Sequence, residues 1–104
     1  MANPWAGEVE LVLGGMRHKA KLTLGALAAL EAELAAGSLI ELVERFDQGR
    51  FSARDVVMVL RAGLRASGWS GDGAELDALE GGPLAAARLA AQLLARAFAL
   101  PDAG

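Results

Sequence analysis

The stretch GEVELVLGGMRHKAKL, residues 7–22, constrains the fold more than any other part of this chain. Apolar and polar residues alternate on both sides of Gly14-Gly15, a pattern that predicts two strands joined by a two-residue turn. No later segment has the character of a third strand. A two-stranded ribbon is marginal in water and leaves both of its edges unpaired. The hairpin therefore has to lie on helices, and the sequence leaves open what meets its edges.

The two-residue turn also sets the register of the hairpin. It places acidic residues of the first strand opposite basic residues of the second, and each such pair contributes roughly 0.2–1 kcal/mol. The same register leaves one face mainly apolar, which suits packing on helices. The predicted pairs are Leu13–Met16, Val12–Arg17, Leu11–His18, Glu10–Lys19, Val9–Ala20 and Glu8–Lys21.

Helical start and stop signals fill the rest of the chain. Thr23 is the expected cap of the first helix, and Ser38 with Glu41 predicts a capping box at the second. Ser52 with Asp55 repeats the device, although the shorter acid predicts a weaker box. The expected helices are residues 24–35 (ended by Gly37), a segment from Ser38 to Gly49, a segment that opens at Ser52, residues 74–80, and a last helix from Pro83 to residue 99.

Each of the first three helices carries apolar residues at helical spacing, which predicts one buried stripe per helix. Gly63 lowers helix stability, so we expect a close backbone contact at that position. The predicted stripes are Leu24, Leu27, Leu30 and Leu34, then Leu39, Leu42, Val43 and Phe46, then Val56, Val57, Leu60 and Leu64.

Composition agrees with a helical core. Hydrophobic residues make up 54% of the 104 residues but only 5% are aromatic, so alanine and leucine dominate, as in helices whose backbones approach closely. We therefore expect one α+β domain over residues 1–104, with an N-terminal two-stranded β-hairpin packed on a small bundle of four to five α-helices.

The sequence offers little for catalysis. His18 is the one histidine and falls on the apolar face of the hairpin, and the chain has no cysteine, so no thiolate metal site is available. Acidic residues between positions 72 and 80 do not follow the calcium-loop pattern. We expect no catalytic residue, no cofactor and no metal. The chain lacks a secretory signal pattern and an apolar segment long enough to cross a membrane, so we expect a cytoplasmic protein.

Two features predict a contact with another molecule. Arg54, Arg61 and Arg65 share one side of the third helix, as in a helix-turn-helix protein, but the net charge of −3 argues against nucleic acid and favours a solvated basic face. The same cationic stripe could equally bind an acidic protein partner. In the last helix, the apolar arc that includes Leu94 and Phe98 is wider than a small core needs, so we expect it to contact a partner, although a central helix of the same domain is the alternative.

An ordered series of short motifs runs from the N-terminal NPWAGEVEL to LLARAFALP near the C-terminus. Its members are LTLGAL at 22–27, LE at 30–31, GSL at 37–39, FSARD at 51–55, GL at 63–64 and GW at 68–69. With this order and length, the chain resembles a family encoded in bacterial gene transfer agents and related tailed phages. Members are described as tail assembly chaperones or, in older labels, as tail tube proteins.

The resemblance implies a non-enzymatic chaperone that coats the tape-measure protein until tail tube subunits polymerise around it, acting in the cytoplasm of the producing bacterium. The alternative is a structural tail tube component, and a helix-turn-helix regulator is the weaker rival. Expected partners are the tape-measure protein and tail tube subunits, with no nucleic acid and no membrane; a homo-oligomer stays open. The predicted partner-binding residues are Val12, Arg17, Arg61, Arg65, Leu94 and Phe98.

Overall fold

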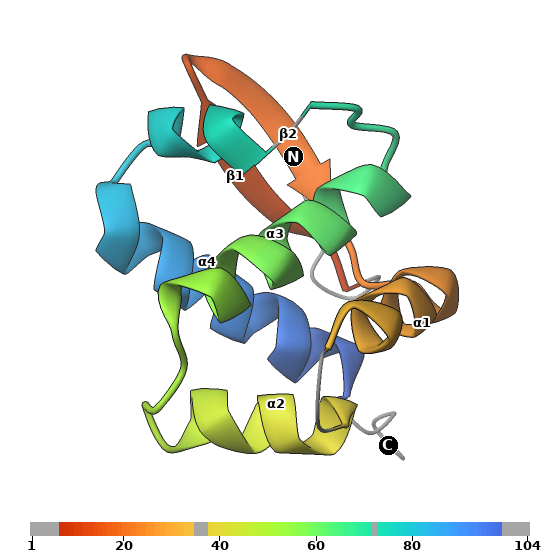
Figure 1. The fold of residues 1–104 in the computed structure, drawn as a ribbon. Helices are drawn as coiled ribbons and strands as arrows, with labels where there is room; N and C mark the ends of the chain where they lie inside the picture. Colours follow the sequence, from red (N-terminus) through yellow and green to blue (C-terminus); the bar gives the residue numbers. More distant parts are fainter. Residues whose placement is uncertain (1–6, 35–37, 72, 99–104) are drawn as a thin grey trace, which may run out of the picture.

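The computed structural model describes residues 7–34, 38–71 and 73–98. Within them a two-stranded antiparallel sheet is followed by helices, so the predicted α+β arrangement is confirmed (Figure 1). The predicted end of the first helix at Gly37 lies outside the described residues. The elements are β1 (Val9–Leu13), β2 (Met16–Ala20), α1 (Leu24–Glu33), α2 (Leu39–Asp47), α3 (Ala53–Ala66), the 3-10 helix η2 (Gly73–Ala78) and α4 (Gly82–Ala97).

The hairpin has the predicted register across all five residue pairs of its two strands. Gly14 and Gly15 form the turn with φ angles of 56° and 84°, a left-handed conformation at both positions that matches the twist of the strands and that glycine adopts without strain. The turn and the charge pairs, such as Glu10 opposite Lys19, are local features, which is why they could be predicted from the sequence.

The outer edge of β1 is covered by a later part of the same chain. Leu79 forms an antiparallel bridge with Leu13, the Glu80 N–H donates to the Val12 carbonyl at 2.8 Å, and the Gly14 N–H donates to the Ala78 carbonyl at 3.1 Å. The expectation that nothing later in the chain acts as a strand is thus wrong at this point, because the residues after η2 add one bridge to the sheet.

Helix α3 lies at the centre of the fold and contacts the hairpin, α1 and α4 (Figure 1). Gly63 is the point of closest approach: a Cβ built there would lie 3.1 Å from Leu93 Cδ1 of α4 and 3.2 Å from Ala20 Cβ of β2. The Gly63 carbonyl also accepts a hydrogen bond from the Lys21 N–H at 3.0 Å. The predicted close contact at Gly63 is confirmed.

The helix caps differ from the expected order of strength. Thr23 caps α1 as predicted. At Ser38 the structure records only the bond from the Glu41 N–H to the serine hydroxyl, at 3.3 Å, whereas both halves of the box are present at Ser52 and Asp55. The box predicted to be weaker is therefore the complete one.

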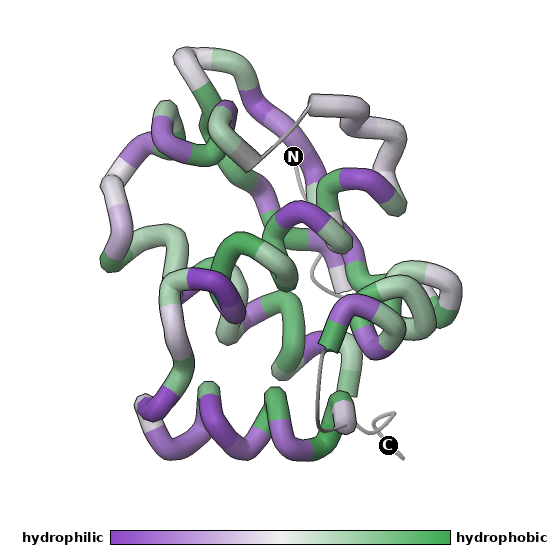
Figure 2. Tube along the Cα trace, in the orientation of Figure 1, coloured by the Kyte–Doolittle hydropathy of each residue, from purple (hydrophilic) through white to green (hydrophobic). Residues whose placement is uncertain are grey.

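Of the twelve predicted core positions, five are buried and six are partly buried against the core, but Leu24 is exposed. Its exposed fraction is 85%, because it is the first residue of α1 and lies two positions before Ala26, on the opposite side of the helix. Ala26 and Leu30, four residues apart, form the buried side of α1 instead. Hydrophilic residues occupy much of α2 (Figure 2). The fully buried side chain of this helix is Leu42.

Helix α4 belongs to the core rather than to a free surface. Ala90, Leu93 and Leu94 have exposed fractions of 0%, 0% and 2%, since α4 contacts α3, β1 and α2. The Arg96 guanidinium adds a hydrogen bond to the Glu8 carbonyl. Leu94, predicted to bind a partner, is instead buried in the core, as in the alternative of a central helix of the same domain, and three neighbours rather than one cover the wide apolar arc of this helix.

The charge pairs of the hairpin can be tested directly. Glu10→Lys places a lysine opposite Lys19 and beside Arg17, so we expect the free energy of unfolding to fall by about 0.5–1.5 kcal/mol. Glu75→Lys, a matched charge reversal at an exposed residue of η2, should change it by less than about 0.5 kcal/mol. Urea unfolding of both variants measures the difference, and equal midpoints would contradict the cross-strand explanation.

Candidate partner-binding site

The structure separates the six predicted partner-binding residues into different places. Val12 and Arg17 are opposite each other on the hairpin, and Arg17 is exposed. Arg61 and Arg65 lie together on α3. Leu94 is in the core, and Phe98, at the end of α4, has an exposed fraction of 43%. Only the α3 pair and the hairpin pair therefore combine neighbouring predicted residues.

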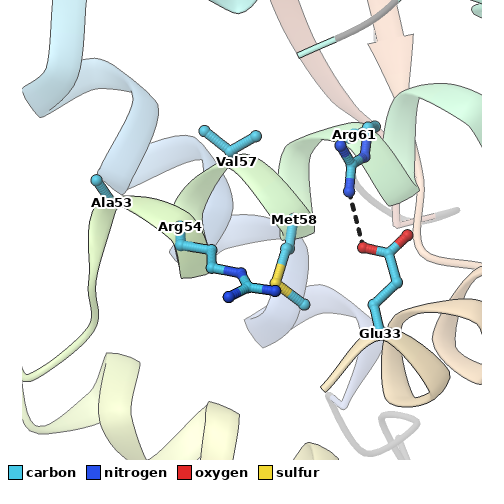
Figure 3. A pocket seen from close by; sticks show the side chains of 6 residues that line it. All are labelled: Glu33, Ala53, Arg54, Val57, Met58 and Arg61. Atoms are coloured by element: carbon cyan, nitrogen blue, oxygen red, sulfur yellow. Dashed lines mark hydrogen bonds and ion pairs between the residues drawn. The ribbon is translucent and has the colours of Figure 1, made fainter. Parts of the chain in front are cut away.

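The α3 arginines line a groove between α1 and α3, which we call the α1–α3 groove. It consists of two adjoining hollows of about 440 and 300 Å³ that share Glu33 and Arg61. Figure 3 shows the residues that line the first of them. The first hollow is lined by Glu33, Ala53, Arg54, Val57, Met58 and Arg61, and the second by Thr23, Gly25, Ala26, Ala29, Leu30, Glu33, Arg61, Ala62, Arg65 and Ala66.

The groove combines an apolar floor with a cationic side. Met58 and Leu30 are buried in its floor, and small residues such as Ala29 and Ala62 leave room for another backbone to approach. Along α3, Arg54 and Arg65 are eleven residues apart, which corresponds to roughly 16 Å of helix axis. The groove is thus long enough for about three turns of a second helix.

An ion pair crosses the groove. The Arg61 guanidinium donates to Glu33 Oε2 of α1 at 2.8 Å, while Arg54 and Met58 project from the same side of α3 (Figure 3). The side chains of Arg61 and Glu33 have exposed fractions of 26% and 41%. Glu33 therefore fixes Arg61, whereas Arg54 and Arg65 are exposed and have no recorded ion pair among the described residues.

Sequence reasoning found only the α3 side of this groove. The spacing of Arg61 and Arg65 placed both on one helix face, but Glu33, Ala29 and Met58 were not predicted to contribute. Helical periodicity alone gave no signal for the α1 residues, because the direction in which α1 packs on α3 is a tertiary property. The exposed alanines of α1 were the available hint, since a helix exposing small apolar residues allows close approach.

The N-terminus of α3 is held by a partly buried ion pair. Arg45 Nε and Nη2 donate to the two Asp55 carboxylate oxygens at 3.1 and 3.0 Å, and the Ser52 N–H donates to Asp55 at 2.9 Å. Burial opposes ionisation of Asp55, but the hydrogen bonds from Arg45 and Ser52 outweigh it and hold the pKa of this carboxyl below its usual value. This pair fixes α2 relative to the start of α3, and hence the Arg54 end of the groove.

Two other hollows lie outside the α1–α3 groove. One, of about 400 Å³, runs between α3 and α4 and is lined mainly by apolar residues such as Phe51, Val57 and Pro83. The other, of about 470 Å³, lies at the hairpin tip and includes Met16, His18 and Trp69. In residues 7–34, 38–71 and 73–98, acidic and histidine side chains form no group that could hold a metal ion, and no helix has the length and apolar run needed to cross a membrane.

Comparisons with known proteins gave one informative result. A family model described as "Phage tail tube protein, GTA-gp10" matches residues 6–100 of this chain. No curated protein and no solved structure matches it. The matched range includes the hairpin, the α1–α3 groove and the Arg45–Asp55 pair.

Proposed function

The chain belongs to the family of phage tail tube proteins that includes GTA-gp10, and from this premise we propose that it is a non-enzymatic tail assembly chaperone that binds the tape-measure protein. Binding would take place in the α1–α3 groove, through helix–helix contacts, in the cytoplasm of the producing bacterium. The groove is the single observation on which this proposal rests, since it joins an apolar floor to exposed cationic residues.

The chemistry of the groove favours one kind of occupant. An amphipathic helix presents apolar side chains at positions i, i+3, i+4 and i+7, and these would contact Ala29, Met58 and Ala62. Acidic residues beside that stripe would meet Arg54 and Arg65. The whole chain has a net charge of −3, so this local concentration of arginines is a specific feature and not a reflection of overall charge.

The same geometry does not favour DNA. A recognition helix enters the major groove with its base-contacting side free. Here α1 lies beside that side of α3, and Glu33 already pairs with Arg61. The helix-turn-helix alternative therefore has weaker support than a protein partner.

A structural tail tube subunit is the second candidate, and the family description itself favours it. A tube wall made of closed sheet needs many strands with a fixed tilt and stagger. The sheet in the described residues has two strands and one additional bridge, which supports the chaperone over the tube subunit. Mass spectrometry of purified particles separates the two roles: a chaperone should be absent or far below the stoichiometry of the tube.

The groove is tested by a pair of substitutions on α1. Ala29→Glu places a longer acidic side chain in the groove and should abolish co-purification with the tape-measure protein. Ala28→Glu is the matched control, because Ala28 is also exposed and helical but does not line the groove. Glutamate is a good helix former, so both variants should fold.

The control determines how the result is interpreted. Circular dichroism melting should show that both variants unfold within about 2 °C of the parent. Equal loss of binding in both would point to a non-specific effect of the added charge. Full binding by Ala29→Glu would place the tape-measure site elsewhere.

A further inference from the structure

We infer that the free edge of β2 is a second docking site, which pairs with an extended segment of another protein in which acidic and apolar residues alternate. This inference is independent of the α1–α3 groove. It rests on a difference between the two edges of the hairpin.

The outer edge of β1 is occupied by groups of this chain. The Val12 carbonyl accepts from Glu80, the Gly14 N–H donates to Ala78 at the end of η2, and Arg96 bonds to the Glu8 carbonyl. These bonds show that the even-numbered residues of the hairpin's first strand direct their backbone groups away from β2. These bonds lie at both ends of the β1 edge, so a further strand would have to displace residues 78–80 and Arg96 to pair along it.

The edge of β2 is free over its central residues. Arg17 is opposite Val12, and Lys19 is opposite Glu10, so the backbone N–H and C=O groups of Arg17 and Lys19 also point away from the partner strand. The structure records no hydrogen bond for these outward groups within the described residues. At the end of this edge the Lys21 N–H donates to the Gly63 carbonyl of α3. This bond limits the free edge to a short segment.

The side chains on this edge determine what an added strand would carry. Arg17 and Lys19 are exposed on one face, and the Arg17 side chain has an exposed fraction of 79%, with the Glu10 carboxylate 4.0 Å from its Nε. Residues of an added strand that lie beside these cations would best be acidic. On the other face, Met16 is 67% exposed and borders the hollow that contains His18 and Trp69, so the intervening residues would best be apolar.

Charge also argues against a second copy of this chain as the occupant. Two β2 edges paired antiparallel around His18 would place Arg17 of each copy opposite Lys19 of the other. Like charges directly opposite destabilise a strand pair. The β1 edge of a second copy is covered by its own chain, so it offers no alternative.

Amide hydrogen exchange measured by NMR tests this site. In the free protein, the Arg17 and Lys19 amides should exchange faster than those of Leu11 and His18, which pair within the hairpin. Addition of an acetylated hexapeptide of alternating glutamate and valine should slow exchange of the Arg17 and Lys19 amides by about tenfold. The same peptide with lysine in place of glutamate should leave both rates unchanged.

Substitutions complete the test. Lys19→Pro removes the outward N–H while sparing the bonds between β1 and β2, a position where an edge strand tolerates proline, and it should abolish the peptide effect. Ala29→Glu alters only the α1–α3 groove and should leave the effect intact, so the two sites can fail separately. The inference would be overturned if the acidic peptide left the exchange rates of the Arg17 and Lys19 amides in the parent protein unchanged. This measurement decides the question even if Lys19→Pro fails to fold. Dimerisation of the parent protein through β2 would also overturn the inference.

Discussion

Leu94→Glu should unfold the protein, whereas Phe98→Glu should leave it folded. Leu94 has an exposed fraction of 2% in the core between α3, α4 and the hairpin, and Phe98 has one of 43% at the end of α4. A carboxylate in that interior has no partner, so we expect the free energy of unfolding to fall by about 4 kcal/mol or more. This loss is comparable to the whole stability of a small domain. Circular dichroism melting of the two variants measures the difference.

A conservative change at the same position controls for the effect of mutation itself. Leu94→Met keeps the volume and the apolar character of the side chain, so it should lower the free energy of unfolding by less than about 1.5 kcal/mol. If Leu94→Glu instead melted cooperatively near the temperature of the parent, α4 would have to be peripheral and its packing against Gly63 and β1 would be wrong.

The hairpin shows what local sequence patterns can establish. The turn at Gly14-Gly15 and the facing charges of Glu10 and Lys19 are close in sequence, and together they predicted all five pairs of the two strands. The bridge from Leu79 to Leu13 had no such signal. It depends on how the chain returns after α3, across more than sixty residues.

Helix α4 shows where a pattern admits two interpretations. An apolar arc wider than one neighbour can cover is typical of a helix that binds a partner and also of a helix buried between two elements of its own domain. The sequence gives the width of the arc around Leu93 and Leu94 but not the number of neighbours. The structure supplies three, α3, β1 and α2, and Leu94 thereby becomes a core residue.

For the same reason, only the α3 side of the candidate site could be predicted from the sequence. Arg61 and Arg65 are four residues apart on one helix, so their shared face followed from helical geometry. Glu33 reaches the groove from a different helix and pairs with Arg61 across twenty-eight positions of sequence. Contacts of this kind depend on packing directions that neither capping signals nor periodicity determine.

Asp55→Ala should produce the second-largest loss of stability, about 2–3 kcal/mol. The substitution removes the acceptor for the Ser52 N–H at the start of α3, and it leaves the Arg45 guanidinium, whose side chain is 31% exposed, without its bidentate partner. Loss of a cap costs about 0.5–2 kcal/mol, and a partly buried arginine left unpaired adds to it, though less than in a dry interior. Urea unfolding at pH 7 gives the value, and Asp55→Asn should lose less because its amide oxygen still caps the helix.

The pH dependence of this effect has a definite sign. The pKa of Asp55 is lower in the folded protein than in the unfolded chain, where it is about 3.9, because the hydrogen bonds from Arg45 and Ser52 outweigh the opposing effect of burial. Ionised Asp55 therefore stabilises the fold in full above that unfolded value, and the contribution is lost as the pH falls through the lower folded value. The stability difference between the parent and Asp55→Ala should be constant from pH 7 to about pH 5 and should narrow below about pH 4. A difference that grew on acidification would mean that the protonated carboxyl is the form that the fold favours, and the Arg45–Asp55 pair could not then be what holds α2 against α3.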